Sequence, residues 1–130
     1  MILLDTTILA DFLRGNKNAV KFIESLNDTA YTTEVNVFEL TTGAYLFKGD
    51  TSKNLEKVIA LISRLRVLQL DRKAALKGGQ ILGELIKEGK KIEETDCLIA
   101  GIAITNGINK IVTANISHYE RIKEIEVIDY

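Results

Sequence analysis

The sequence lacks proline and tryptophan altogether and contains one cysteine, Cys97. The absence of proline excludes polyproline segments and Pro-rich linkers, and a single cysteine excludes an intramolecular disulfide. Such cysteine usage is typical of a reducing cytoplasm. Cys97 stands in an apolar run, so we interpret it as a small core residue and not as a reactive thiol. Since Gly/Ser-rich linkers, repeats and low-complexity tracts are also missing, we expect a single domain over residues 1–130.

Long hydrophobic runs and a large net charge are missing as well. The apolar opening at residues 2–4 ends at Asp5, without the basic start or the cleavage pattern of a signal peptide. No run approaches the length of about 20 residues that a membrane helix needs. The formal net charge is -1, which excludes a global basic field that would attract a polyanion. We therefore expect a cytoplasmic protein that neither spans nor binds a membrane. A local basic patch or a metal ion would have to attract any nucleic acid.

The chain does contain a regular alternation of short apolar runs and amphipathic segments. The apolar runs predict strands over 2–4, 29–32, 66–70 and 110–113, with a fifth candidate at 126–128. Helical spacing predicts helices over 7–13, 19–26, 34–48, 52–63, 71–87 and 95–105. The glycines of the 71–87 helix, Gly78, Gly79 and Gly83, should let another helix approach it closely. This alternation predicts an α/β fold, a three-layer α/β/α sandwich with a central parallel sheet of four to five strands. Such folds bind ligands at the carboxyl edge of the sheet, where the strand order reverses.

Polar residues follow or face this edge at several points. Asp5 directly follows the first expected strand, and Asn115 follows the fourth. Asp96 opens the helix before the fourth strand and shares a helical stripe with Ile99 and Ala103, so its side chain should point toward the sheet. Each residue also has an ordinary interpretation: a helix N-cap for Asp5, a turn residue for Asn115, and a favourable helix dipole for Asp96.

Glu39 is the fourth polar residue expected at this edge. It lies less than two helical turns from the start of the 34–48 helix, which is apolar nearly all round. A partly buried glutamate needs a partner, although a glutamate that reaches solvent is the alternative. Clustered carboxylates repel one another unless a cation is present, and oxygen ligands suit Mg²⁺ or Mn²⁺. One histidine and one cysteine do not make a zinc site.

The same positions resemble the motifs of a known family. The segments are Leu3-Leu4-Asp5-Thr6-Thr7-Ile8-Leu9, Phe38-Glu39-Leu40 with Gly43, Asp96-Cys97-Leu98-Ile99-Ala100-Gly101-Ile102-Ala103, and Val112-Thr113-Ala114-Asn115-Ile116-Ser117-His118-Tyr119. In this order they resemble the four motifs of PIN-domain ribonucleases, with Thr7 as a mild departure from Asn or Ser. The length and layout resemble the VapC-type toxins of VapBC toxin–antitoxin systems.

The resemblance implies a metal-dependent endoribonuclease with Mg²⁺ or Mn²⁺ as its cofactor. Asp5 and Asp96 would be the main metal ligands, Glu39 would complete the acidic group as a ligand or through water, and Asn115 would replace a fourth charge. The hydroxyls of Thr6 and Thr113 would position the carboxylates. The resemblance further implies an RNA substrate, a cognate antitoxin and a homodimer.

Candidate contacts to RNA are Arg14 and Lys17, which follow the first expected helix, and His118, which matches a variable polar position of the closing motif. Ordinary surface residues are the alternative for all three. The 34–48 helix has two apolar faces, which indicates an interface with another chain. The alternative is that both faces are buried within the chain.

Two other functions remain open at this point. In an aspartate-nucleophile phosphatase or phosphotransfer domain, Asp5 would be the nucleophile. However, the phosphatase version needs a second aspartate where Thr7 stands, and the phosphotransfer version needs a lysine after a late strand, whereas Lys110 precedes its strand. The second alternative is a PIN-like RNA-binding or RNA-processing protein with a weakened site, for which Asn115 leaves room.

Overall fold

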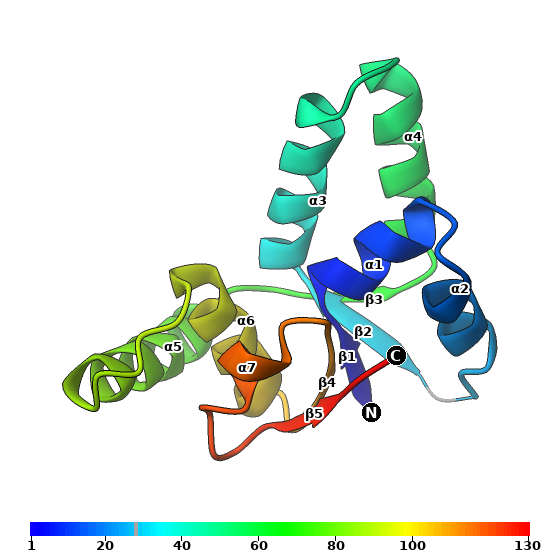
Figure 1. The fold of residues 1–130 in the computed structure, drawn as a ribbon. Helices are drawn as coiled ribbons and strands as arrows, with labels where there is room; N and C mark the ends of the chain where they lie inside the picture. The colour runs from blue at the N-terminus through cyan, green and yellow to red at the C-terminus, as the bar shows by residue number, and fades with distance from the viewer. Residues whose placement is uncertain (28) are drawn as a thin grey trace.

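In the computed structural model, which describes residues 1–27 and 29–130, five short strands form one parallel sheet (Figure 1). The strands are β1 (Ile2–Leu4), β2 (Ala30–Thr33), β3 (Arg66–Leu68), β4 (Lys110–Val112) and β5 (Glu126–Ile128). Their order is β3-β2-β1-β4-β5, and each neighbouring pair is parallel. The predicted parallel sheet is therefore confirmed, with the fifth candidate strand at its edge.

The helices cover both faces of this sheet. They are α1 (Thr6–Leu13), α2 (Lys17–Glu24), α3 (Glu34–Leu46), α4 (Thr51–Ile62), α5 (Arg72–Lys87), α6 (Glu94–Thr105) and α7 (Ile116–Tyr119). In Figure 1, α1 and α2 lie on one side of the sheet, and α5, α6 and α7 lie on the other. The helices α3 and α4 pair with each other and project away from the sheet, and we call this hairpin, residues 34–62, the arm.

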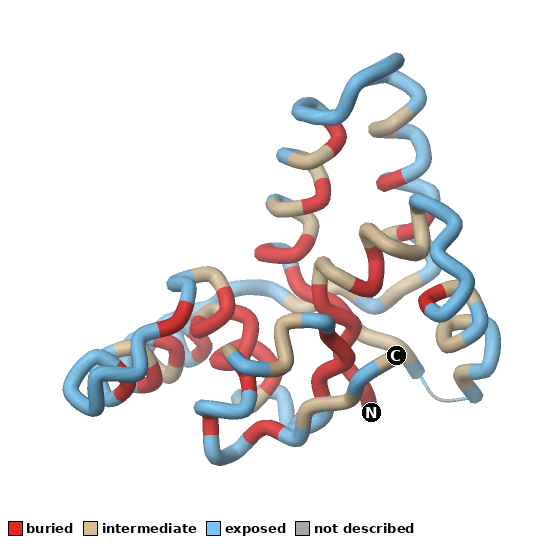
Figure 2. The backbone as a smooth tube through the Cα atoms, viewed as in Figure 1, coloured by how far each residue is buried: buried red, intermediate tan, exposed pale blue. Residues whose placement is uncertain are grey.

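Two hydrophobic cores explain why the central strand β1 is apolar throughout. Successive side chains of a strand point to opposite faces of a sheet. Leu3 and Ile111 accordingly belong to the core beneath α5 and α6, while Leu4 and Val112 belong to the core shared with α1 and α4. Figure 2 shows the buried residues along the sheet and on the helix sides that face it. A strand that is buried on both faces shows no alternation of polar and apolar residues, which is the pattern of a covered parallel sheet.

The helices α5 and α6 approach each other closely through glycine. A Cβ atom on Gly101 would lie 2.6 Å from the carbonyl oxygen of Ala74 and 2.8 Å from the backbone nitrogen of Gly78. The expectation that glycines allow a close helix approach is thus met at Gly78. It is wrong for Gly79 and Gly83, where an added Cβ would meet no heavy atom within 4 Å.

Cys97 lies in the α6 core and is buried, as interpreted from its apolar surroundings. Burial raises the pKa of its thiol to about 11, and the charges of Asp96 and Glu94 act in the same direction. A thiol with such a pKa is a poor nucleophile. Across the described part of the chain, none of the helices combines the length and the apolar character that crossing a bilayer requires.

Candidate active site

The strand order reverses between β1 and β4, and the candidate site lies at the carboxyl ends of these two strands. Asp5 follows β1 and Thr113 follows β4, so the register of the parallel pair places them side by side. The Thr113 hydroxyl donates to Oδ2 of Asp5 over 2.7 Å. The site therefore occupies the position at which open α/β sheets bind ligands.

Asp5 is almost completely buried, with 2% of its surface exposed. Besides Thr113, its carboxylate accepts hydrogen bonds from Nδ2 of Asn36 at 3.2 Å and from the Tyr119 hydroxyl at 3.3 Å, both on Oδ1. Burial raises the pKa of Asp5, and the negative charge of Asp96 raises it further, against the lowering effect of the Thr113 hydrogen bond. Asp5 is thus a buried carboxylate whose charge is destabilised when no cation balances it.

Asp96 lies in the first turn of α6 and is 4% exposed, as its predicted direction toward the sheet requires. The Tyr119 hydroxyl contacts Oδ1 of Asp96 at 3.3 Å as well as Oδ1 of Asp5. The two carboxylates, which are far apart in the sequence, therefore lie within two hydrogen-bond lengths of each other. Nδ1 of His118 lies 2.7 Å from the other oxygen of Asp96. In the tautomer that carries its proton on Nδ1, His118 donates to this oxygen, because an ionised carboxylate only accepts hydrogen bonds.

Glu39 joins this group through hydroxyl and amide side chains. Its Oε1 accepts a 2.7 Å hydrogen bond from the Thr6 hydroxyl, which in turn accepts a 2.9 Å bond from Nδ2 of Asn36. The Thr95 hydroxyl donates to Oε2 over 3.4 Å. Burial raises the pKa of Glu39, and the nearby charges of Asp5 and Asp96 add to this effect. The sequence-based choice of a partnered glutamate over a solvated one is confirmed.

Sequence reasoning did not single out Asn36 and Tyr119. Asn36 belongs to a capping box with Thr33 at the start of α3, which fixes its side chain so that Nδ2 points at Asp5. A capping pattern fully explains an asparagine at this position, so the sequence offers no separate signal of a site. For Tyr119 a signal existed, because a buried tyrosine hydroxyl needs a partner and carboxylates were expected nearby.

Asn115 and Thr7 lie at the edge of the same network. The Asn115 backbone N–H donates to the Thr113 hydroxyl at 3.0 Å, and the Ala114 N–H donates to Thr7 Oγ1 at 2.9 Å. The side chain of Asn115 is half-buried and makes no hydrogen bond to any residue that the structure describes. The structure thus brings Asp5, Glu39, Asp96, His118, Thr6 and Thr113 into one hydrogen-bonded group and leaves the Asn115 amide beside it.

The carboxylate oxygens of Asp5 and Asp96 are ligands of the kind that a hard divalent cation prefers, and the two groups lie close enough to share one ion. Among the described residues, no three side chains of His, Cys, Asp or Glu lie close enough together to share one ion. Mg²⁺ is usually bound by one or two carboxylates together with water and substrate phosphates, which matches the pair of Asp5 and Asp96. Glu39 is linked to Asp5 through two hydrogen-bonded residues, Thr6 and Asn36, so it would contact such an ion through water.

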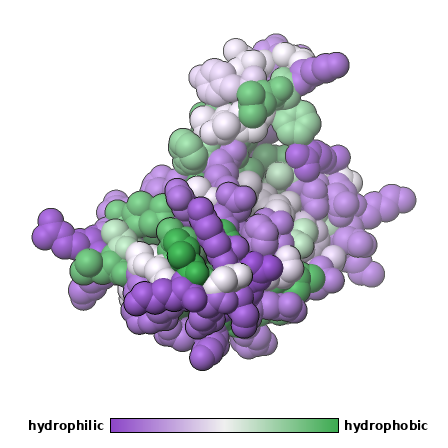
Figure 3. Space-filling view, turned by 60° about the vertical axis from the view of Figure 1, so that its left-hand side comes forward, coloured by the Kyte–Doolittle hydropathy of each residue, from purple (hydrophilic) through white to green (hydrophobic). Residues whose placement is uncertain are grey.

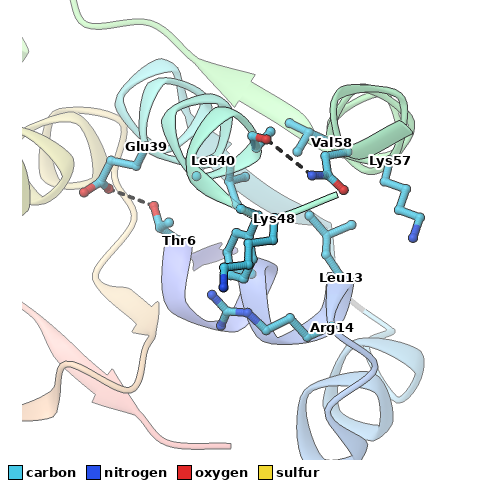
Figure 4. Close-up of a pocket in the computed structure, with 13 residues that line it drawn as sticks. Thr6, Leu13, Arg14, Glu39, Leu40, Lys48, Lys57 and Val58 are labelled. Atoms are coloured by element: carbon cyan, nitrogen blue, oxygen red, sulfur yellow. Dashed lines mark hydrogen bonds between the residues drawn. The ribbon is translucent and has the colours of Figure 1, made fainter. Parts of the chain in front are cut away.

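The two basic residues that were expected to contact RNA, Arg14 and Lys17, differ in their position relative to the candidate site. Arg14 lines a cavity between α1 and the arm, whose lining also includes Thr6 and Glu39 (Figure 4). Lys17 is exposed at the first residue of α2 and is not part of this cavity. Arg14 therefore lines the same cavity as Glu39, whereas nothing in the structure connects Lys17 with the carboxylates.

Comparison with known proteins places this geometry in a family. The family model "PIN domain" matches residues 2–124. A "tRNA(fMet)-specific endonuclease VapC" from Shigella flexneri is 31% identical over 129 residues, which cover 98% of this chain and 96% of that protein. A protein of the same name from Salmonella typhimurium is 41% identical over 78 residues, or 60% of this chain and 58% of that protein.

Solved structures agree with the sequence comparisons. A chain in the crystal structure of DNA-bound VapBC from Salmonella typhimurium superimposes with a TM-score of 0.88 and 32% identity. The match covers 98% of this chain and 96% of that chain. The likeness therefore extends over the whole α/β architecture, including the sheet edge that carries the carboxylates.

Proposed function

This chain belongs to the PIN-domain family, and from that premise we propose that it is a metal-dependent endoribonuclease, the toxin of a toxin–antitoxin pair. The observation that carries the proposal is the junction at Tyr119, where the carboxylates of Asp5 and Asp96 meet. The two VapC relatives described above are named as tRNA-specific endonucleases, which supports RNA as the substrate class. Membership in the family disfavours the alternative of an aspartate nucleophile.

We assign Asp5 and Asp96 to the direct binding of Mg²⁺ or Mn²⁺ and Glu39 to binding through water. A bound divalent ion would lower the pKa of its water and offset the charge of the scissile phosphate. Thr113 and Asn36 hold Asp5 in one orientation, and Tyr119 fixes Asp5 relative to Asp96. These hydrogen bonds organise the two carboxylates before an ion arrives, which favours binding.

Glu39 is the group that we assign to the attacking water. Its raised pKa makes it a better proton acceptor than an ordinary surface glutamate. The water oxygen forms a bond to phosphorus while the bond to the leaving 3′ oxygen breaks. Glu39 takes the proton of the water, and the leaving 3′ oxygen takes a proton from the solvent to become a hydroxyl. The products would carry 5′-phosphate and 3′-hydroxyl ends.

The partners we propose are an antitoxin protein and a second copy of this chain. Phe38 and Leu46 of α3 are 65% and 79% exposed, and Tyr45 is exposed beside them. The alternative that both apolar faces of this helix are buried within the chain is therefore wrong. Figure 3 shows hydrophobic side chains on the surface of the arm. Exposed apolar groups in such number are typical of a protein interface. A cytoplasmic location would give access to both RNA and antitoxin.

RNA cleavage by the purified chain tests the function. We expect cleavage with Mg²⁺ or Mn²⁺ that stops on addition of EDTA. Asp5→Asn and Asp96→Asn should each lose about a hundredfold or more, because even groups that only orient metal ligands contribute about 10–100-fold. Asp129→Asn, at an exposed position, is the matched control. A wild-type protein as inert as folded Asp5→Asn toward many RNAs would instead support the RNA-binding alternative with a weakened site.

A further inference from the structure

A cavity of about 270 Å³ lies between α1 and the arm and reaches the carboxylate network (Figure 4). Thr6 and Glu39, joined by their 2.7 Å hydrogen bond, belong to its wall. The rest of the lining is largely apolar and comes from α1, α3, the residue after α3, and α4: Ala10, Leu13, Leu40, Ala44, Phe47 and Val58. An occupant of this cavity would therefore rest on an apolar surface directly beside the residue that we assign to the attacking water.

The rim of the cavity is basic. Arg14, Lys48 and Lys57 are among the residues that line it, and Glu39 is the one carboxylate in that lining. In Figure 4 the charged ends of Arg14 and Lys48 lie near each other, and Lys57 lies across the cavity. A chain of net charge -1 thus places three cations around one opening beside its acidic site. This is the local attraction for phosphates that the overall charge does not supply.

The cavity offers a flat stacking surface at its rim and a hydrogen-bonding group in its lining. The guanidinium carbon of Arg14 lies 4.9 Å from the ring centroid of Phe47, so a planar cation and an aromatic ring face each other at the rim. Asn54 donates from Nδ2 to the carbonyl of Ala44 at 3.3 Å, and its side-chain oxygen makes no hydrogen bond to any described residue. At Gly43 the cavity extends to the α3 backbone, since an added Cβ would meet no heavy atom within 4 Å.

We propose that this cavity binds one unpaired nucleobase of the RNA substrate, next to the phosphate that is cleaved. The proposal rests on the proposed ribonuclease function and narrows the substrate class to single-stranded RNA. Unpaired bases stack on aromatic rings and guanidinium planes and form hydrogen bonds along their edges, which Phe47, Arg14 and Asn54 provide. Bases within a duplex are stacked inside the helix and cannot enter such a cavity. The basic rim favours RNA over an apolar peptide as the occupant.

A glycine substitution can fill the cavity without disturbing the fold. Gly43→Leu places a side chain in the open space, and leucine is a better helix former than glycine. Gly79→Leu is the matched control, because Gly79 is also a helical glycine with no neighbour within 4 Å, on α5 away from the cavity. Binding is measured by fluorescence anisotropy in EDTA, where no cleavage occurs. The probes are labelled oligoadenylate, labelled oligouridylate, their duplex, and inorganic polyphosphate as a competitor that has no bases.

We expect the single strands to bind more tightly than the duplex. Gly43→Leu should weaken single-strand binding on the order of tenfold, the effect of losing one stacked base, and leave competition by polyphosphate unchanged. Gly79→Leu should behave as wild type. Unchanged RNA affinity in Gly43→Leu would overturn the proposal, and so would equal losses for RNA and polyphosphate or equal affinity for single strand and duplex. Normal RNA binding with altered self-association in light scattering would assign the cavity to a protein contact instead.

These experiments distinguish a failure of the base-binding cavity from a failure of the proposed ribonuclease function. A wild-type chain that cleaves no RNA but binds single strands in a Gly43-dependent manner would reject the nuclease and retain the base-binding cavity. A chain that cleaves RNA with the same KM in wild type and Gly43→Leu would reject the cavity and retain the nuclease.

Discussion

Nδ1 of His118 lies 2.7 Å from Oδ2 of Asp96, and this contact fixes α7 against the first turn of α6. His118 comes from the closing motif, where the sequence left a surface histidine as the alternative to a phosphate contact. The structure instead gives it a carboxylate partner. A hydrogen bond to the second oxygen of a metal-binding carboxylate restricts the orientations of that carboxylate. The first prediction tests this role for His118, with Asp96 as the proposed metal ligand.

His118→Ala should weaken the binding of Mn²⁺ by about 10–100-fold, because Asp96 loses the donor that orients it. His118→Asn should restore most of the affinity, since the asparagine amide can donate from nearly the same position as Nδ1. Isothermal titration calorimetry of the metal-free proteins measures both. Equal Mn²⁺ affinity in wild type and His118→Ala would show that the contact does not prepare the site.

Tyr119→Phe should lower the free energy of unfolding of the metal-free protein by about 1–3 kcal/mol. The substitution removes one hydroxyl from two buried carboxylates, and hydrogen bonds to charged groups are the stronger ones. Urea unfolding in EDTA provides the measurement. Tyr31→Phe is the control, because the Tyr31 hydroxyl has no hydrogen-bond partner among the residues that the structure describes. If both variants are equally stable, the Tyr119 hydroxyl contributes nothing to holding the carboxylates.

Asp5→Asn should make the metal-free protein more stable near neutral pH. A carboxylate whose pKa is raised by folding stabilises the protein at low pH, and this contribution is lost as the pH rises through the folded-state pKa. The gain from Asp5→Asn should therefore shrink as the pH falls through that pKa. Urea unfolding in EDTA at several pH values tests the sign. A destabilised Asp5→Asn protein at neutral pH would contradict it. Saturating Mg²⁺ should stabilise wild type more than the variant.

Gly101→Ala should destabilise the fold by about 1–3 kcal/mol, because the new methyl group overlaps the backbone of α5. Gly79→Ala, on an open face of α5, should instead stabilise it by up to about 1 kcal/mol through helix propensity. Thermal and urea unfolding compare the pair. The prediction fails if Gly101→Ala is as stable as wild type, which would mean that α5 and α6 can separate without loss.

Phe38→Ser combined with Tyr45→Ser should reduce self-association without lowering the stability of the monomer. Both side chains are exposed on α3, so their removal opens no internal cavity. Light scattering over a range of protein concentrations measures the change. Leu76→Ser, at an exposed apolar position on α5, is the matched control. A double variant that associates as wild type would place the dimer interface elsewhere.

Much of the fold was accessible from the sequence because burial on both faces leaves strands apolar throughout, as in Ile2–Leu4. Parallel strands share one carboxyl edge, so the meeting of Asp5 and Asp96 followed from the order of elements alone. Helix α7 was missed because four residues are too short to show a period. The wrong expectation for Gly79 and Gly83 arose because spacing along α5 does not reveal which side faces α6.

Side-chain partnerships were far less accessible. Asn36 and Tyr119 reach Asp5 from positions 31 and 114 residues away, and no local pattern encodes such a contact. The sequence grouped Glu39 with the aspartates, either as a metal ligand or as a residue that acts through water. In the structure, Thr6 and Asn36 lie between Glu39 and Asp5. Asn36 precedes Glu39 by about one turn of α3, and it is Asn36 that contacts Asp5 directly.

The separation of Asp5 and Tyr119 along the chain determines at which point of translation the group of buried carboxylates can be completed. Asp5 leaves the ribosome early, but its partners Thr113 and Tyr119 are made 108 and 114 residues later. Until α7 has emerged and folded, the two aspartates lack the hydroxyl that joins them. A chain that ends before α7 would therefore lack the hydroxyl that joins the two carboxylates, and we expect such a chain to bind a divalent ion less well than the full chain.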